Sequence, residues 1–239
     1  MRKELIDGMV ETALNGQSIS NEQALQLESF THEELDYLFI GTDRIRDQFK
    51  GENVKICSIV NVKSRRCVED CSFCGQSSTF KTDAPEFELM SVEEMVTAAK
   101  EAEAFGANEF SIVTSGTKMN DRQELDRVKE AVRRIKAETK LETCCSLGWL
   151  ELDHLKELKE AGLDPCHHNL ETAASYFEKI VTTHTYEDEV NAVQNAQKAG
   201  LDVCVGGIFG MGESFTQRVE LAFSIRDLGT QSLPINFLK

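Results

Sequence analysis

The chain has 239 residues, and 41 acidic against 26 basic side chains give it a formal net charge of −15. This length allows one large domain or two small ones, and a negative field of this size argues against nucleic acid as a partner. No apolar run is long enough to span a membrane and no signal peptide precedes the first charged residues, so we expect a cytoplasmic protein.

The chain is predicted to begin with a helical extension over residues 1–50. Ser20 and Thr31 each stand three residues before a Gln or Glu, the capping-box pattern of a helix start, and leucines follow. Ser91 begins a third such pattern. From residue 51 to 239, short apolar runs alternate with amphipathic helices, which predicts strands at 56–62, 109–114, 141–147, 165–170, 203–209 and 233–238.

A short internal repeat indicates how these elements connect. The tetrapeptide Ala-Gly-Leu-Asp occurs at 161–164 and at 199–202, each time after a predicted helix and before a predicted strand. Repeated helix–glycine–strand units predict a parallel sheet with right-handed crossovers. A closed barrel of eight such units needs about 250 residues, so we expect about six of the eight units of a TIM-type (β/α) barrel. The chain stops at a predicted strand, which favours a C-terminal truncation.

Three of the eight cysteines form a compact motif. Cys67, Cys71 and Cys74 have the spacing C-x3-C-x2-C in a loop after the first predicted strand. Disulfides rarely persist in a reducing cytosol, so the motif indicates metal binding or catalysis. Zinc normally takes four ligands in paired C-x2-C units, and no second pair follows at that spacing. Three thiolates fit a four-iron cluster with one iron left open to a small molecule. A cysteine outside the motif is more often a small buried apolar residue.

The motif and its context resemble the biotin synthase family of the radical S-adenosylmethionine (SAM) superfamily. The cysteine spacing alone is common to the superfamily, whereas the later segments together are specific to the family. The match runs from about residue 55 to the end of the chain. The segments that carry it are 67–78, 168–172, 182–186, 203–208, 210–213 and 234–238.

The resemblance implies an enzyme that inserts sulfur into dethiobiotin to form biotin through a 5′-deoxyadenosyl radical. It implies a radical SAM barrel in which a 4Fe–4S cluster on Cys67, Cys71 and Cys74 binds SAM, with no catalytic side chain beyond the cofactor ligands. A flavodoxin or ferredoxin as electron donor and a homodimer are the further implied partners.

The resemblance also assigns ligand contacts. Asn169 and Asn236 stand where the family contacts its substrate, and their amides match a cyclic urea. Glu171 replaces an aspartate that reaches the cofactor ribose, and Gly206 and Gly207 suit a close approach of backbone to adenosine. In other readings Asn169 is a turn former and the two glycines only permit close packing. Asn236 lies in an apolar run, where an unpaired buried amide is costly.

Three charged residues complete this picture. Glu69 and Asp70 are expected to be solvated loop acids. His184 stands where the family commonly has an arginine, so an anion contact there is expected to depend on pH.

A second cluster is expected to differ from that of the family. Most members hold a 2Fe–2S auxiliary cluster on three cysteines and an arginine. Cys144 and Cys204 match two of these positions, but the third is Ser111, and a hydroxyl is a poor ligand for a soft metal. We therefore predict a four-iron auxiliary cluster on Cys144, Cys166 and Cys204. Cys145 alternates to the other face of a regular strand and joins only if the strand end is distorted.

Other functions stay open at this point. Asn236 and the glycines at 206 and 207 favour biotin synthase. The alternatives are a radical SAM enzyme for another small molecule, such as a metallocentre maturase or an amino-acid mutase, and a non-catalytic iron–sulfur or zinc protein. A brown chromophore after anaerobic reconstitution with iron and sulfide distinguishes the iron–sulfur readings from zinc. A truncated chain is expected to have low activity by itself.

Overall fold

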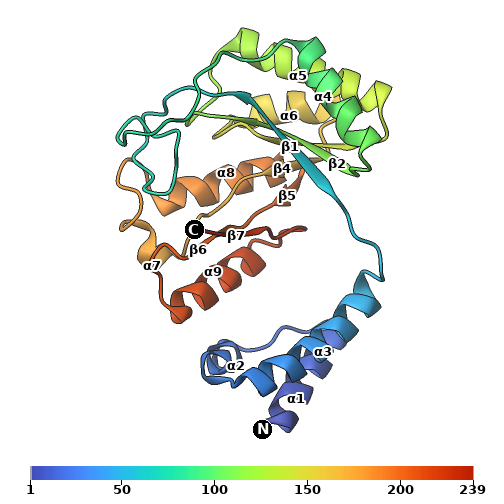
Figure 1. The fold of residues 1–239 in the computed structure, drawn as a ribbon, viewed down its shortest axis with the longest axis vertical. Coiled ribbons are helices and arrows are strands. Elements are labelled where there is room, and N and C mark those ends of the chain that lie inside the picture. The colour runs from blue at the N-terminus through green and yellow to red at the C-terminus, as the bar shows by residue number, and fades with distance from the viewer. Residues whose placement is uncertain (1, 239) are drawn as a thin grey trace. The chain divides into compact units, whose positions relative to one another are not determined.

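The structure is a computed structural model that describes residues 2–238 (Figure 1). It divides into two compact units. One contains Met1–Val54 and Ser214–Val219, and the other contains Lys55–Glu213 and Glu220–Lys239. No helix within residues 2–238 combines the length and the apolar character that crossing a membrane requires.

The first unit is helical. Its elements are α1 (Lys3–Leu14), α2 (Asn21–Gln26), the 3-10 helix η1 (Leu27–Ser29) and α3 (His32–Phe49). Ile6, Met9, Val10 and Phe30 form its buried core. These side chains come from the apolar stripe of α1 and from the turn before α3, so the helices bury one face each.

Local hydrogen bonds fix where three helices begin. The hydroxyls of Ser20, Thr31 and Ser91 accept from the backbone N–H three residues later, and the side chain at that position accepts from the cap N–H. All three predicted capping boxes are therefore confirmed. Each satisfies two backbone donors that a helix start would otherwise leave unpaired.

The second unit is built on a parallel sheet with the strand order β1-β2-β3-β4-β5. The strands are β1 (Cys57–Lys63), β2 (Glu109–Thr114), β3 (Glu142–Ser146), β4 (Pro165–His167) and β5 (Asp202–Cys204). The connecting helices are α4 (Val92–Ala104), α5 (Arg122–Glu138), α6 (Leu152–Ala161), α7 (Ala174–Phe177) and α8 (Tyr186–Lys198). Of α9 (Phe215–Asp227), the part from Glu220 onward belongs to this unit. Sequential parallel order with helical crossovers is the arrangement of a (β/α) barrel wall.

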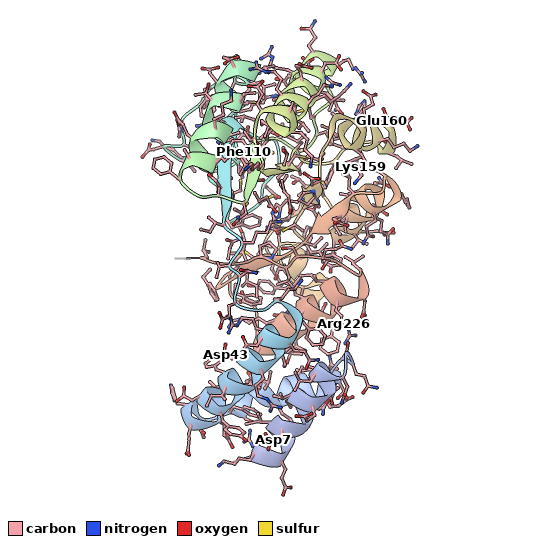
Figure 2. All side chains as sticks on the ribbon, turned by 90° about the vertical axis from the view of Figure 1, so that its right-hand side faces the viewer. Asp7, Asp43, Phe110, Lys159, Glu160 and Arg226 are labelled. Atoms are coloured by element: carbon pink, nitrogen blue, oxygen red, sulfur yellow. The ribbon has the colours of Figure 1, made fainter. Side chains whose placement is uncertain are left out.

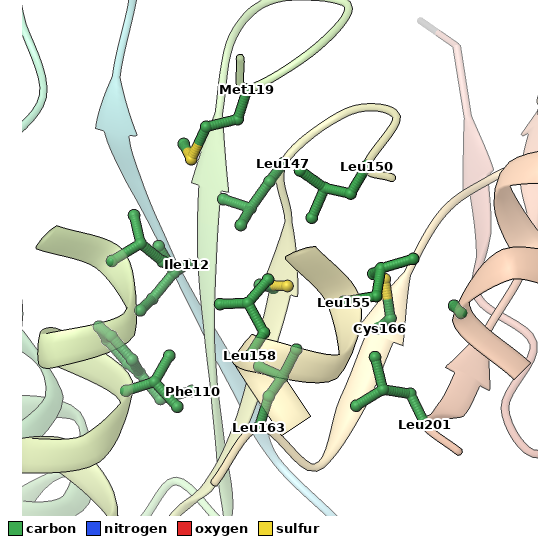
Figure 3. Packing of buried hydrophobic residues seen from close by; sticks show 14 of the residues in the cluster. Phe110, Ile112, Met119, Leu147, Leu150, Leu155, Leu158, Leu163, Cys166 and Leu201 are labelled. Atoms are coloured by element: carbon green, nitrogen blue, oxygen red, sulfur yellow. The ribbon is translucent and has the colours of Figure 1, made fainter. Parts of the chain in front are cut away.

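The core of this unit lies between the sheet and its helices. Phe110 and Ile112 from β2, Leu155 and Leu158 from α6, and Cys166 from β4 belong to one buried apolar cluster, part of which Figure 3 shows. On the outside, the exposed pair Lys159 and Glu160 projects from the end of α6 (Figure 2). One apolar face on each helix therefore covers one face of the sheet.

The predicted strand over 203–209 is wrong in one respect, because two strands take its place. β5 ends at Cys204, and β6 (Gly207–Phe209) pairs in parallel with β7 (Ile235–Phe237). Between them, Gly206 N–H donates to Asn169 Oδ1 at 3.1 Å instead of to a strand. A Cβ on Gly206 would lie 1.8 Å from the carbonyl oxygen of Pro234. The close approach of Pro234 and the side-chain bond from Asn169 therefore break the strand. β4 is likewise shorter than predicted and ends at His167.

Candidate functional site

A cavity of about 460 Å³ opens at the carboxyl ends of the strands. Asn61, Val113, Ser146 and His167 line it, and they come from the last residues of β1, β2, β3 and β4. Ligand sites of parallel (β/α) barrels lie at this edge because the loops that follow the strands converge there.

The three motif cysteines all line this cavity. Their loop is held by its own backbone. Cys67 N–H donates to Gln76 O at 2.7 Å, Ser78 N–H donates to Cys67 O at 2.8 Å, and Cys74 N–H donates to Cys71 O at 3.0 Å. The predicted grouping of Cys67, Cys71 and Cys74 in one site is thus what the structure contains.

The chemistry of these donors fits an iron–sulfur cluster. Burial, followed by the neighbouring Cys74, raises the pKa of Cys71 to about 12, and burial also raises the pKa of Cys74. Such thiols ionise only beside a strong positive charge, which bound iron provides. Within residues 2–238, no three His, Cys, Asp or Glu side chains are grouped tightly enough for one metal ion. A four-iron cluster takes one thiolate at each of three irons, so three cysteines around one cavity suit it.

The acids of the motif are not free loop acids, contrary to expectation, because both hydrogen-bond to other parts of the protein, although Asp70 stays partly exposed. The Asp70 carboxylate accepts hydrogen bonds from both the backbone and the hydroxyl of Thr182, the backbone bond measuring 2.9 Å. It also accepts from the N–H and the hydroxyl of Thr183, at 3.2 and 3.1 Å. These bonds, those of Thr182 first, lower the pKa of Asp70 to about 2. Asp70 therefore ties the cysteine loop to the segment before α8.

Glu69 belongs to a buried network centred on His184. His184 Nδ1 lies 2.8 Å from Glu69 Oε2, and His184 Nε2 lies 2.8 Å from Glu189 Oε1. Glu189 also accepts a hydrogen bond from Trp149 Nε1 at 3.1 Å and contacts His168 Nε2. Burial would lower the pKa of His184, but the hydrogen bonds to Glu189 and Glu69 raise it to about 9. His184 is therefore positively charged at neutral pH, and the expected pH dependence of a contact with an anion there moves up to about pH 9.

This charge gives stability a defined pH dependence. The folded-state pKa of His184, about 9, lies above the ordinary value of 6.5. The network therefore stabilises the fold fully below about pH 6.5, and this contribution is lost as pH rises through 9. We expect urea unfolding at pH 6 and pH 9.5 to show a loss that the His184→Gln variant lacks. An equal loss in both proteins would contradict the assignment.

Two of the five residues predicted to contact the cofactor or the substrate lie at the cavity, and three do not. Asn169 and Glu171 line the cavity, and Asn169 Nδ2 lies 3.4 Å from Glu171 Oε2. Burial, with a further contribution from Glu189, raises the pKa of Glu171 to about 8, so its carboxyl group is mostly protonated at neutral pH. Glu171 also has a left-handed backbone, with φ of 62°.

The other three predicted contact residues, Asn236, Gly206 and Gly207, do not line this cavity. Asn236 is exposed on β7, so the expectation of a buried amide is wrong. Gly206 and Gly207 are explained by packing, since a Cβ on Gly207 would lie 2.6 Å from the carbonyl oxygen of Glu171. A role of these residues in binding stays a prediction.

The predicted auxiliary ligands lie on two different faces of the sheet. Cys145 pairs with Cys166 across β3 and β4, and both are buried in the core beneath the helices, where Figure 3 labels Cys166. Side chains alternate along a strand, so Cys144 lies on the opposite face. Cys204 lies there too, because its neighbour Val203 pairs with Cys166. The expected convergence of Cys166 with Cys144 and Cys204 is therefore corrected.

Sequence reasoning missed Trp149 and Glu189 as parts of the site. Glu189, Val193 and Ala196 are all buried on α8, at the spacing of one helix face. An acid on an apolar helix face needs a partner. A glutamate among the apolar residues of one helix face was therefore the sequence signal that could have indicated a buried polar network at Glu189.

Comparison with known proteins shows which family the chain belongs to. Residues 61–225 match the model of the radical SAM superfamily. The chain is 46% identical over 233 residues to a biotin synthase of Geotalea uraniireducens, covering 98% of this chain and 71% of that protein. A biotin synthase of Citrifermentans bemidjiense is 47% identical over 236 residues, with coverage of 99% and 72%. The chain belongs to the biotin synthase family.

Solved structures confirm the predicted fold class. Methylornithine synthase matches with a TM-score of 0.85 at 19% identity, covering 97% of this chain and 68% of that one. HydG, a maturase of the FeFe-hydrogenase, matches with a TM-score of 0.83 at 18% identity, with coverage of 100% and 56%. Identities this low show only a common radical SAM barrel fold. Family membership brings a 4Fe–4S cluster and SAM as cofactors.

Proposed function

We propose that this chain inserts sulfur into dethiobiotin to form biotin, as a radical SAM sulfurtransferase. The observation that carries the proposal is the identity of 46–47% to biotin synthases along nearly the whole chain. The cavity at the strand ends, with three cysteines and Asn169 in its lining, is in keeping with it.

Cys67, Cys71 and Cys74 would hold the 4Fe–4S cluster. Once reduced by an external donor, such a cluster would supply the single electron needed to cleave SAM to methionine and a 5′-deoxyadenosyl radical, which takes hydrogen from unactivated carbon. The protein's part is to position the loop and to exclude water. The bonds from Asp70 to Thr182 and Thr183 position the loop.

Glu171 and the glycine pair would contact the cofactor. A protonated Glu171 both donates and accepts hydrogen bonds, which suits the hydroxyls of a ribose. Gly206 and Gly207 would present backbone to the adenosine. Asn169 and Asn236 would pair with the cyclic urea of dethiobiotin.

An auxiliary iron–sulfur cluster would supply the sulfur. Cys144 and Cys204 share a face of the sheet and would be its first two ligands, whereas Cys166 and Cys145 belong to the core. We keep the prediction of four irons in place of the family's usual two. Mössbauer spectra of the reconstituted chain distinguish the two cluster types.

The further partners are proposed from the resemblance. Electrons would come from a flavodoxin or ferredoxin, the active form would be a homodimer, and the reaction would take place in the cytoplasm. A gel-filtration mass and reduction by each donor protein test the first two.

The function is tested by anaerobic reconstitution with iron and sulfide. We expect a brown protein that forms 5′-deoxyadenosine from SAM and then biotin from dethiobiotin. If deoxyadenosine forms but dethiobiotin neither binds nor reacts, the chain acts on another small molecule. If neither product forms from an intact cluster, the chain is a non-catalytic iron–sulfur protein.

The Asn169→Ala variant tests the substrate. We expect dethiobiotin affinity to fall by about 1–3 kcal/mol, because a buried polar group of the substrate loses its partner. SAM cleavage without substrate should change little. Asn191→Ala, which removes an exposed asparagine of α8, is the matched control. Isothermal titration with dethiobiotin measures the effect, and an unchanged affinity in Asn169→Ala argues for a different substrate.

A further inference from the structure

A further cysteine lies on the face of the sheet that carries Cys144 and Cys204. Cys57 on β1 pairs with Glu109 on β2, and Ser111 on β2 pairs with Cys144 on β3. Residues paired in parallel strands point the same way, as do residues two apart in one strand. Cys57, Glu109, Ser111 and Cys144 therefore share one face.

The register also places the three thiols in one layer. Cys57 on β1 pairs with Glu109 on β2, and Glu109 pairs with Glu142 on β3. Cys144 lies two residues after Glu142 along β3. From Cys144, the pairing leads through Pro165 to Asp202, and Cys204 is again two residues further along β5.

A shift of two residues between alternate strands is the register expected within one interior layer of a barrel. Because the strands tilt, one layer of interior side chains comes from alternate strands. β1, β3 and β5 are alternate strands, and they contribute Cys57, Cys144 and Cys204.

We propose that Cys57 supplies the third thiolate of the auxiliary iron–sulfur cluster, together with Cys144 and Cys204. This inference rests on the proposed function, which calls for such a cluster. It accounts for the serine at position 111, since a thiol on the adjacent strand β1 provides the soft ligand that the hydroxyl does not.

The alternatives are less suited for geometric reasons. Cys145 and Cys166 face the helices and are only 0% and 8% exposed. To ligate a cluster on the other face of the sheet, their strands would have to rotate their side chains through the sheet. Cys57 is exposed at the start of its strand and is open to incoming iron.

The test isolates the auxiliary cluster first. The full chain with Cys67, Cys71 and Cys74 all changed to Ala is reconstituted anaerobically, and iron, sulfide and Mössbauer spectra are measured. We expect this protein to keep the auxiliary iron. Adding Cys57→Ala should remove that iron, whereas adding Cys145→Ala or Cys166→Ala should leave it unchanged.

A rescue variant separates ligation from folding. Adding Ser111→Cys to the Cys57→Ala protein restores a thiol at the position that the family uses, and should restore the iron. Circular dichroism monitors the fold of each variant. Retained iron in Cys57→Ala, or loss in Cys57→Ala without recovery in the rescue variant, would overturn the assignment of Cys57.

Failure of this inference and failure of the proposed function can be told apart. If the protein without the loop cysteines binds no iron, this layer holds no cluster and the inference fails, while the unchanged chain still reports on SAM cleavage. If auxiliary iron binds and depends on Cys57 but dethiobiotin is not converted, the site stands and the proposed function fails.

Discussion

Alanine in place of any one of Cys67, Cys71 or Cys74 is expected to abolish SAM cleavage. Within residues 2–238, no other cysteine lines the cavity, so no spare thiolate replaces the lost ligand. A cluster left with two protein ligands has no stable attachment and loses iron. The amount of 5′-deoxyadenosine formed after anaerobic reconstitution and reduction measures the effect.

The control for this prediction is Cys166→Ala. Cys166 lies in the core, away from the cavity, and its removal should leave deoxyadenosine formation near that of the unchanged chain. Deoxyadenosine at the unchanged level in any of the three loop variants would defeat the assignment of the cluster.

Glu189→Ala is expected to have the largest effect on stability. Glu189 is buried and receives hydrogen bonds from Trp149, His168 and His184. Its removal leaves the buried His184 cation with one carboxylate instead of two. Breaking a buried ion pair from one side costs about 3–5 kcal/mol, and the pKa of His184 should fall toward its ordinary value.

Urea unfolding measures this loss, and the single tryptophan reports on it directly. Trp149 is the one tryptophan of the chain, and its indole N–H loses its acceptor in the variant, so its emission should change. Glu187→Ala, an exposed glutamate on the same helix, is the control. A free energy of unfolding within about 1 kcal/mol of the unchanged chain would show that the network is not required.

Features that depend on neighbours along the chain were predictable from the sequence. The capping boxes at Ser20, Thr31 and Ser91 are confirmed because each is complete within four residues. β2 occupies 109–114, as its run of apolar and β-branched residues predicts.

Features that depend on distant contacts were not predictable. Asp70 finds its partners 112 and 113 residues away, so the sequence gives no reason to place it in a network. The break between β5 and β6 depends on Asn169, 37 residues before Gly206, and on the approach of Pro234. Alternation correctly separated Cys145 from Cys144, but placing Cys166 required the register of β4 against β3.

The bonds from Asp70 to Thr182 and Thr183 bear on how the enzyme is maintained. They involve only protein atoms, so this part of the support of the cysteine loop does not depend on iron. A loop that its own chain already holds costs less conformational entropy to order when a cluster assembles on it. Replacing a damaged cluster would then draw on a support that the protein supplies by itself.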